Sequence, residues 1–546
     1  MRQLPLKGAL KVCKDETVYS GILPEDSGSM IILRRKRTMK KILAMLVTLA
    51  LLIVPFAAMA EQVLDPATPK NVELYVDWTW VEYDTFEGGI CQDYLREQTG
   101  VTVDMTKATD SEQLNLLIAS GDLPDMIACS SSSKVARLSD PDMCYPLQEL
   151  IDQYVPQWEI SDVEKNINAY FSTDGNYYML KNEYNTAEEI KAASNLGINF
   201  GQFHVRDDLY EAMGRPEVKT KEDFFALLAK VKETYPQMQP LVFNPREYSA
   251  FGSLVGYDVT RPMKDGKLVM SISDPTYRDM LLTINELYRA GYITKENFSY
   301  TSDEQTFQNL YAGNVFMVTH FACNDEQTMT AKLKTVLPEA SIEQLPLLDN
   351  FKYTMPVSGW AACFITRSCE DPETAIKLLY WAKQQNNATS LTYGVPGIDW
   401  DYDEIGNIVT LDRYNQAMAN GTVANDYREM GFHLSATNYI TIYNGYYASA
   451  TDRTRKIFDD AVSRTTFSNA IDLAYPKADT DLRYAYDDIS SLTSEYFSKL
   501  CTADSEEAFN AMWDEMMADA ESIGLADVDE YLSTTYAEVC GILGCE

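Results

Sequence analysis

Apolar and polar positions alternate along Asn71–Asp77, which predicts a first β-strand there. A helix is predicted over Ile90–Gln98 and is closed by Gly100, and a second strand is predicted over Val101–Met105. Apolar residues at helical spacing then predict another helix over Gln113–Ala119. Strands that alternate with helices in this way are typical of an α/β protein with a mostly parallel sheet.

The segment that follows reads Ala-Ser-Gly-Asp-Leu-Pro-Asp-Met-Ile over residues 119–127. Gly121 is suited to end the helix, because glycine tolerates the left-handed backbone found at helix C-termini. Pro124 prevents the helix from resuming, and Met126–Ala128 then forms a short buried strand. This segment resembles one near the start of the extracellular solute-binding proteins (family 1, the oligosaccharide-type group) that feed ABC importers.

Other segments resemble the same family in the family's own order, between about residues 70 and 540. They are Ser172–Leu180, Gly201–Leu209, Lys219–Phe225, Tyr311–Phe321, Pro356–Ile365 and Tyr393–Asn407. The resemblance implies an α/β, two-lobe periplasmic-binding-protein fold (type II), in which each lobe is a mostly parallel sheet flanked by helices.

The resemblance also implies how the lobes divide the chain. The first lobe is expected over residues 61–185 with a return segment at about 355–400, and the second over 190–350 with about 400–546. Hinge segments would cross near residues 180–205 and 350–365. The ligand would bind in the cleft between the lobes, and closure of the lobes would hide it from water.

An export signal is predicted near the N-terminus. Met39-Lys40-Lys41 forms a basic start, residues 42–59 are almost wholly apolar, and Ala58-Met59-Ala60 fits cleavage after Ala60. An uncleaved membrane anchor is the alternative, because the apolar run approaches the length that spans a bilayer. Residues 1–38 are expected to be a non-native extension before a true start at Met39, with an unusually long signal as the alternative.

No cysteine lies near the predicted cleavage point, so no lipobox and no lipid anchor are indicated. The protein is therefore expected to be exported, to the periplasm or the cell exterior. Cys363 with Cys369, and Cys540 with Cys545, are close enough in sequence to form disulfides. Buried, unpaired cysteines are the alternative, since a chain of this length can build a core without disulfides.

Net charge excludes one class of partner. The chain carries a formal charge of −35, and its first 60 residues are basic, so the remainder is more acidic still. A surface of this charge repels phosphate backbones, which argues against nucleic acid as a partner.

Two tryptophans are the first candidates for ligand binding. Trp78 and Trp80 follow the first strand directly, where parallel sheets place ligand contacts. Sugar rings stack on flat aromatic side chains, and an indole also donates a hydrogen bond. The alternative is that one of the two rings covers the core.

Five further residues are candidate ligand contacts. Ser130 and Ser131 follow the third strand, and their hydroxyls can bond a polyol; a plain loop is the alternative. His320 follows the predicted strand Val315–Thr319, with a structural histidine as the alternative. Trp360 lies beside the hinge and either stacks on ligand or braces the crossing, and Tyr393 is expected at the cleft mouth.

No catalytic residue, cofactor or metal ligand set is predicted. With three histidines in the chain, neither a histidine cluster nor a Ser-His-Asp triad is indicated. The carboxylates of Asp399–Asp403 lack the glycine and the distal glutamate of a calcium-binding EF-hand loop, so a solvated acidic hairpin is predicted there.

The resemblance implies a monomeric receptor that captures a carbohydrate, expected to be an oligosaccharide, and delivers it to the permease subunits of an ABC importer. Three alternatives stay open: a receptor for peptides or other polar solutes, a secreted carbohydrate-active enzyme, and a surface sensor or adhesin with the same fold. An enzyme would need a pair of carboxylates facing each other across the cleft.

Overall fold

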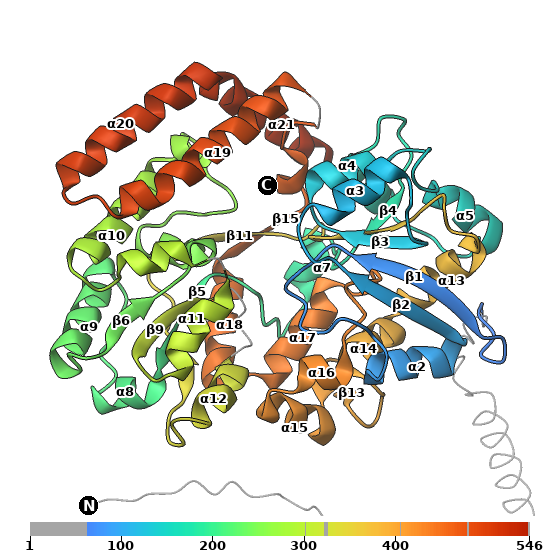
Figure 1. The fold of residues 1–546 in the computed structure, drawn as a ribbon, viewed down its shortest axis with the longest axis horizontal. Coiled ribbons are helices and arrows are strands. Elements are labelled where there is room, and N and C mark those ends of the chain that lie inside the picture. Colours follow the sequence, from blue (N-terminus) through green and yellow to red (C-terminus); the bar gives the residue numbers. More distant parts are fainter. Residues whose placement is uncertain (1–62, 301, 321–325, 405, 478–479, 544–546) are drawn as a thin grey trace, which may run out of the picture. The chain divides into compact units, whose positions relative to one another are not determined.

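The computed structural model describes residues 63–300, 302–320, 326–404, 406–477 and 480–543 (Figure 1). The predicted export signal, its cleavage after Ala60 and the expected extension over residues 1–38 lie outside this part of the chain. Among the described residues, no helix combines the length and the apolar character needed to cross a bilayer.

The first sheet contains five strands in the order β2-β1-β3-β12-β4. Their bounds are β1 Lys70–Val76, β2 Val101–Lys107, β3 Met126–Cys129, β4 Met179–Lys181 and β12 Ala362–Ile365. The strands β1, β2 and β3 pair in parallel, as the alternation of strands and helices predicts. The returning strand β12 lies antiparallel between β3 and β4, so the chain enters this sheet a second time from the opposite direction.

Side chains of the first sheet bury two separate faces, as the period of two in a strand requires. Leu74 and Val103 point into a cluster with helices on one side, while Tyr75 and Ile127 point into a cluster on the other side. Helices α2 (Ile90–Thr99), α13 (Pro372–Ala382) and α14 (Gln385–Tyr393) cover the first face, and α3 (Gln113–Ser120) and α4 (Ser132–Leu138) cover the second (Figure 1).

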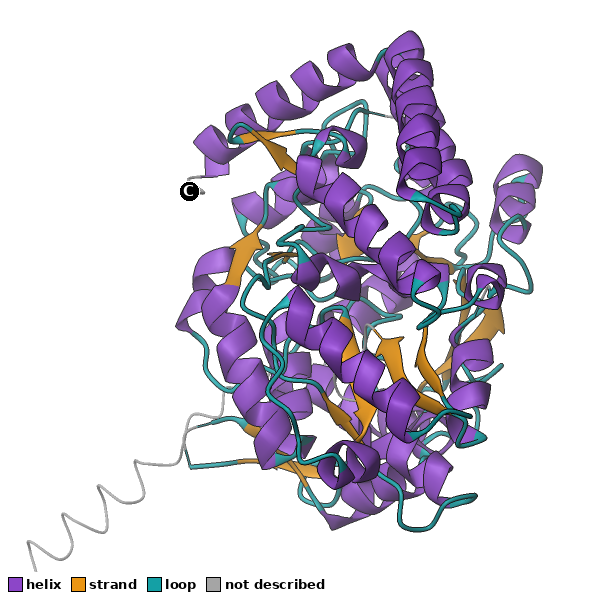
Figure 2. Cartoon of the chain, turned by 90° about the vertical axis from the view of Figure 1, so that its left-hand side faces the viewer, coloured by secondary structure: helices purple, strands orange, loops and turns teal. Residues whose placement is uncertain are grey.

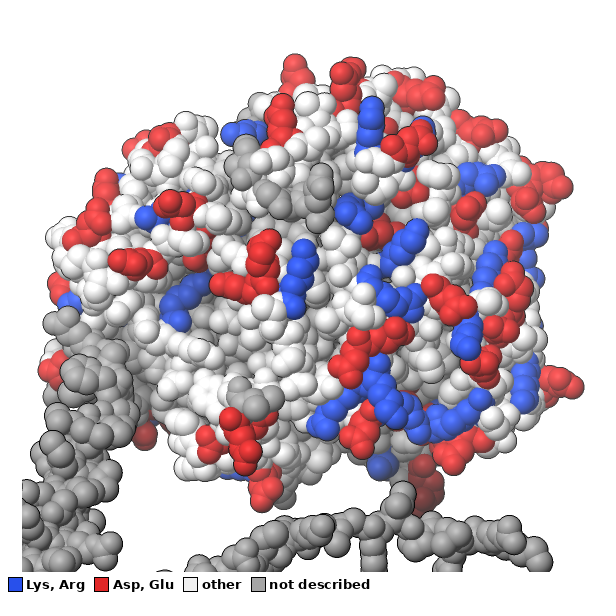
Figure 3. Space-filling model, turned by 180° about the vertical axis from the view of Figure 1, so that it is seen from behind, with Lys and Arg blue, Asp and Glu red and all other residues white. Residues whose placement is uncertain are grey.

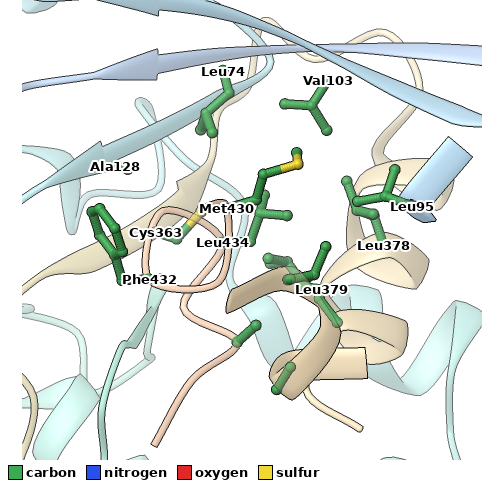
Figure 4. Close-up of a cluster of buried hydrophobic side chains, with 14 of the residues drawn as sticks. Leu74, Leu95, Val103, Ala128, Cys363, Leu378, Leu379, Met430, Phe432 and Leu434 are labelled. Carbon is green, nitrogen blue, oxygen red and sulfur yellow. The ribbon is translucent and has the colours of Figure 1, made fainter. Parts of the chain in front are cut away.

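Residues 400–404 and 406–436 pack into this same part of the molecule, although the family resemblance implies a place in the second lobe for them. Met430 and Leu434 are fully buried beneath the first sheet, beside Leu379 of α13 (Figure 4). This segment contains the hairpin β13 (Trp400–Tyr402) and β14 (Ile408–Thr410), and helices α15 (Asp412–Asn420) and α16 (Val423–Tyr427). The apolar side chains of the segment complete the core that the strands alone leave open.

The second sheet has four strands in the order β10-β5-β9-β6. Their bounds are β5 Gln202–Arg206, β6 Gln239–Val242, β9 Val315–His320 and β10 Ile342–Gln344. Only β6 and β9 pair in parallel, whereas β5 pairs antiparallel with both β9 and β10. This sheet is therefore mixed, because β5 arrives from the crossing segment and β10 leads back toward it.

Helices surround the strands of the second sheet, as the purple ribbons around the orange arrows show (Figure 2). Their bounds are α8 Asp207–Ala212, α9 Lys221–Thr234, α10 Pro275–Arg289, α11 Asp303–Tyr311, α12 Glu326–Lys334, α19 Asp481–Cys501, α20 Glu506–Ile523 and α21 Leu525–Leu543, with the 3-10 helix η1 Pro245–Leu254. The three C-terminal helices share one core with this sheet.

A third core cluster gathers the segments that run between the two sheets. It contains helices α7 (Ala187–Ala192), α17 (Tyr439–Ser449) and α18 (Asp452–Arg464) and the parallel strands β11 (Tyr353–Pro356) and β15 (Thr465–Ser468). The amide of Asn185 donates to the Val357 carbonyl at 3.0 Å, and the amide of Val357 donates to the Ser468 carbonyl at 3.0 Å. Three stretches of chain are thus hydrogen-bonded side by side where the sheets are connected.

The described cysteines, Cys363 and Cys369 among them, are free thiols. Of the two possibilities for Cys363 and Cys369, the buried, unpaired one therefore holds, and both side chains are packed into the core around the first sheet. The predicted partner of Cys540, Cys545, lies outside the described residues.

Candidate functional site

The chain that leaves β1 is fixed by a buried ion pair. The Asp77 amide donates to the Ala128 carbonyl, and the Asp77 carboxylate accepts from Lys134 Nζ at 2.8 Å. Lys134 also donates to the Ser111 carbonyl at 2.7 Å, and both charged side chains are buried. These contacts set the direction in which the two tryptophans that follow β1 leave the sheet.

Five rings from three distant segments meet at this point and form a cluster that we call the aromatic platform: Trp78, Trp80, Trp360, Phe432 and His433. The ring centroid of Trp78 lies 5.1 Å from that of Trp360 and 6.1 Å from that of Trp80. The ring of Trp80 is stacked on Phe432 at 5.8 Å. The platform is therefore one continuous group of aromatic rings. Its rings come from the residues after β1, from the residues before β12 and from the 430–434 segment.

Exposure divides the platform into a base and a face. Trp78 is 4% exposed and its indole nitrogen donates to the Ser130 hydroxyl at 3.3 Å, so this ring supports the others. Trp80 is 54% exposed and Trp360 is 36% exposed. Exposed tryptophan faces side by side are rare on a protein that has no ligand or partner for them, because they leave apolar area in water.

Sequence reasoning missed Phe432 and His433. His433 is fully buried, and burial lowers its pKa to about 3, so its ring is neutral and serves as one more aromatic surface. The Tyr83 hydroxyl lies 3.1 Å from His433 Nε2 and donates to the Glu429 carbonyl at 2.6 Å. No local pattern marks these residues, because their role depends on the 430–434 segment returning beneath the first sheet.

A cavity of about 1260 Å³ borders the platform at Trp360 and Ser130. Its wall comes from α4, residues 170–173 and residues 359–362, which adjoin the first sheet, and from residues 472–477 and 480–487, which lead into α19. Tyr170 closes one side by donating from its hydroxyl to the Tyr475 carbonyl at 2.9 Å. The volume suits a ligand of several sugar rings, since drug-sized ligands occupy about 300–1,000 Å³.

Two buried charges lie in the cavity wall. Burial lowers the pKa of Lys181 and raises the pKa of Asp472. The negative charge of Asp472 partly offsets the lowering at Lys181, and the positive charge of Lys181 partly offsets the raising at Asp472. Lys181 Nζ donates to the Gly359 carbonyl at 3.2 Å. Lys181 and Asp472 together carry no net charge, and they offer a polar ligand both hydrogen-bond donors and hydrogen-bond acceptors.

Two buried carboxyl groups, Glu183 and Glu429, lie behind the platform. Burial raises the pKa of Glu183 to about 7, and a hydrogen bond with the Trp360 side chain partly offsets the effect. Burial and the neighbouring Glu183 raise the pKa of Glu429 to about 8. The Glu183 backbone has a φ of +49°, which is uncommon for a residue with a side chain, and its amide donates to the Thr437 carbonyl at 2.8 Å.

These carboxyl groups predict a fall in stability at alkaline pH. Their folded pKa values are raised, so their contribution is fully present below about pH 4.5 and is lost as the pH rises through 7 and 8. Between pH 6 and pH 8, we expect Glu429 alone to account for about 2 kcal/mol of lost stability, at about 1.4 kcal/mol per pH unit. Urea unfolding of the wild type and of Glu429→Gln at both pH values measures this.

The Glu429→Gln variant should flatten the pH dependence, because glutamine has no charge to bury. Exposed Glu82 provides the matched control, and Glu82→Gln should keep the wild-type slope. Equal slopes for Glu429→Gln and the wild type would contradict the assignment of the loss to this carboxyl group.

The other predicted site residues lie elsewhere. The Ser131 hydroxyl bonds that of Ser133 at 3.0 Å, just before α4. His320 ends β9 and is 7% exposed, with its ring edge-on to Phe307. Neither Ser131 nor His320 is among the residues that line the cavity.

Tyr393, expected at the cleft mouth, is instead buried in the core. Its hydroxyl donates to the Ile442 carbonyl at 3.1 Å, and its ring packs edge-on against Tyr414 at 5.4 Å. The side chain is 2% exposed because Gly445 of α17 leaves room for the ring to approach the helix backbone.

The acidic hairpin is only partly solvated. Strands β13 and β14 form the predicted hairpin, but Asp399 is fully buried and accepts hydrogen bonds from Arg413, from the Val395 amide and from the Tyr427 hydroxyl. Asp399 is therefore a structural anchor rather than part of a solvated acidic surface.

No protein-family model matches the chain. It is 26% identical over 229 residues to the fructooligosaccharide ABC transporter substrate-binding protein FusA of Streptococcus pneumoniae serotype 4 (strain ATCC BAA-334 / TIGR4), a match that covers 38% of this chain. The chain spans only 41% of the length of that curated relative.

Solved structures match over most of both chains. The alginate-binding protein AlgQ2 without calcium ion has a TM-score of 0.63 at 18% identity, covering 88% of this chain and 99% of that one. A solute-binding protein from Bifidobacterium longum infantis, described as binding HMO and associated with an ABC transporter, has a TM-score of 0.61 at 14% identity, covering 86% and 98%. The fold of this chain is therefore the α/β, two-lobe fold of the solute-binding proteins that serve ABC transporters.

Proposed function

We propose that this protein is an exported receptor that captures an oligosaccharide and passes it to the permease of an ABC importer. The observation that carries the proposal is the aromatic platform, in which Trp360 borders a large cavity with polar and apolar side chains in its wall, and the exposed ring of Trp80 lies 6.1 Å from that of Trp360. Sugar rings stack on such faces, while their hydroxyls bond the polar wall. The relatives described above are transport proteins that bind sugars, which supports the same conclusion.

The core clusters support an assignment of the two lobes. We assign residues 63–185 and 361–436 to the first lobe, and residues 201–350 and 471–543 to the second. The segments between them form the third cluster, which would act as the hinge. Ligand binding then couples to closure, because Trp360 and Lys181 lie where the crossing segments meet the cavity.

The charge distribution on the surface agrees with a receptor that does not bind nucleic acid. Basic side chains lie beside acidic ones over the face shown in Figure 3, with no extended basic patch of the kind that binds nucleic acid. We infer a monomer that docks on permease subunits and carries out no covalent chemistry on its ligand.

Thermal unfolding of residues 61–546 against a panel of oligosaccharides, uronates and peptides tests the proposal. A ligand that binds only the folded state raises the midpoint by mass action, so one glycan class should produce a saturable rise. A rise with peptides alone would overturn the carbohydrate assignment. Formation of a shortened glycan would overturn the receptor assignment and point to the buried carboxyl pair Glu183 and Glu429 as an enzyme site.

Replacing Trp80 by alanine should weaken glycan binding about 30-fold, which corresponds to about 2 kcal/mol for a central tryptophan at a binding surface. The unliganded protein should keep its unfolding midpoint, because more than half of the ring is already in water. Calorimetric titration measures the affinity. Leu116 on α3, an apolar side chain that is 70% exposed, supplies the control, and Leu116→Ala should bind as the wild type does.

A further inference from the structure

A second group of chemically active side chains lies in the second sheet, away from the aromatic platform. Glu247, Asp303 and His320 each offer one ligand atom, and these three atoms lie within 4.8 Å of one another. The residues are far apart in the sequence, so spacing along the chain gives no sign of the group. The sequence analysis considered only His320, as a contact for the captured ligand.

The topology explains why these three residues meet. The strands β6 and β9 are parallel neighbours, so their carboxyl ends lie at the same edge of the sheet. Glu247 lies in η1, which follows β6, and His320 is the last residue of β9. Asp303 is the first residue of α11, which starts at this edge and runs back toward the start of β9. Three separate elements therefore direct one ligand atom each to one point.

A fourth residue holds two of the three in position. The buried side chain of Asn244 donates from Nδ2 to Asp303 Oδ1 at 2.5 Å, and its Oδ1 accepts from the Arg246 amide at 2.9 Å. The Glu247 amide donates to the Asn244 carbonyl at 3.0 Å. Residues that orient ligands through hydrogen bonds in this way are a regular feature of metal sites.

Burial makes it unfavourable to hold the two carboxylates of this group close together. Glu247 is 8% exposed and His320 is 7% exposed, and the ring of His320 is confined by Phe307 at 4.9 Å and by His204 at 6.0 Å. Two carboxylates this close repel each other in a site that is largely shielded from water. A bound dication would remove that repulsion and use the imidazole as well.

We propose that Glu247, Asp303 and His320 bind a divalent transition-metal ion, with zinc as the ion that their chemistry fits. One imidazole nitrogen with two carboxylate oxygens suits zinc, whereas calcium and magnesium select oxygen ligands alone. Three protein ligands leave a fourth coordination position open for water or for a hydroxyl of a bound solute. Asp303 is partly exposed, which gives the ion a path to the site.

The test uses residues 61–546 freed of metal with a chelator and titrated with ZnCl2, CaCl2 and MgCl2. We expect one zinc per chain, a saturable rise in the unfolding midpoint, and no comparable effect of calcium or magnesium. Cobalt in place of zinc should give visible absorption bands, which report the ligand set directly. No stoichiometric zinc, or calcium in its place, would overturn the proposal.

Asp303→Asn is the decisive variant, because asparagine keeps the oxygen that accepts from Asn244 and the variant should fold. Loss of an orienting partner alone weakens metal sites 10–100-fold, so loss of a ligand should weaken zinc binding by more than about 100-fold. His320→Gln should do the same and change the cobalt spectrum. Glu304→Gln, one residue along the exposed side of α11, is the matched control and should bind zinc as the wild type does. Undiminished zinc binding by both site variants would place the metal elsewhere.

Discussion

Replacing Gly359 by alanine is expected to lower the free energy of unfolding by about 2–5 kcal/mol. Gly359 has a φ of +86°, and a Cβ atom there would overlap the carbonyl oxygen of Asn182 and come within 3.0 Å of the Lys181 side chain. A left-handed backbone costs an ordinary residue about 1–2 kcal/mol, and overpacking adds about 1–3 kcal/mol. Equilibrium unfolding in urea measures the difference.

The close approach at Gly359 has a structural reason. The side-chain oxygen of Asn182 accepts from the amides of Trp360 and Ala361, at 3.2 and 2.9 Å, and the Asn182 amide donates to the Ala361 carbonyl at 3.0 Å. The two crossing segments are thus in direct backbone contact next to Trp360. Gly359→Ala should therefore also disturb glycan binding, through the position of Trp360.

Gly175 separates the two contributions to the loss at Gly359. It has a similar φ of +80°, but nothing lies within 4 Å of the Cβ that alanine would add. Gly175→Ala should lose only the backbone part, about 1–2 kcal/mol. Equal losses in the two variants would show that the crossing segments yield readily, and that their contact does not limit stability.

Replacing Asp399 by alanine is expected to cost about 2–6 kcal/mol, because two of its partners would each lose their acceptor at about 1–3 kcal/mol. Asp399 is fully buried, and its oxygens accept from the Arg413 guanidinium, the Val395 amide at 2.7 Å and the Tyr427 hydroxyl at 2.7 Å. Alanine would leave the amide and the hydroxyl without an acceptor inside the protein. Chemical denaturation gives the magnitude.

Asp401 is two residues away on the same hairpin but is exposed, and Asp401→Ala should stay within about 0.5 kcal/mol of the wild type. A double-mutant cycle with Arg413→Met should show that the two losses are strongly non-additive. A loss below about 1 kcal/mol for Asp399→Ala would mean that the hairpin is not anchored by this carboxylate.

Features that depend on neighbouring residues were predictable from the sequence. Gly100 and Gly121 end their helices in the left-handed conformation, with φ of +75° and +73°, and both predictions are confirmed. Thr220 caps α9 in a capping box with Asp223, and Asp371 caps α13 with proline at the first helical position. Short-range hydrogen bonds and backbone preferences decide these features, and the sequence contains all of that information.

Features that depend on distant packing were not predictable. Trp78, Trp80 and Trp360 could be proposed as candidates because they adjoin strand ends, but Phe432 and His433 join them only through the return of the 430–434 segment. Tyr393 looked like a residue of the cleft mouth, and it is buried because α17 offers a glycine where its ring packs. The mixed pairing of the second sheet likewise follows from where the chain crosses, which no local pattern records.

The position of β12 also constrains how the protein can be made. Ala362 pairs with Lys181 on one side and with Cys129 on the other, so the first sheet remains in two pieces until the ribosome has added more than half of the chain. The core beneath this sheet is completed still later in synthesis, because Met430 and Leu434 are part of it. Contacts of such long sequence separation slow folding, because a large loop must close before they form. An incomplete chain therefore cannot close the core of the first sheet, and folding of this part is expected to finish only after residues 430–434 have been synthesised.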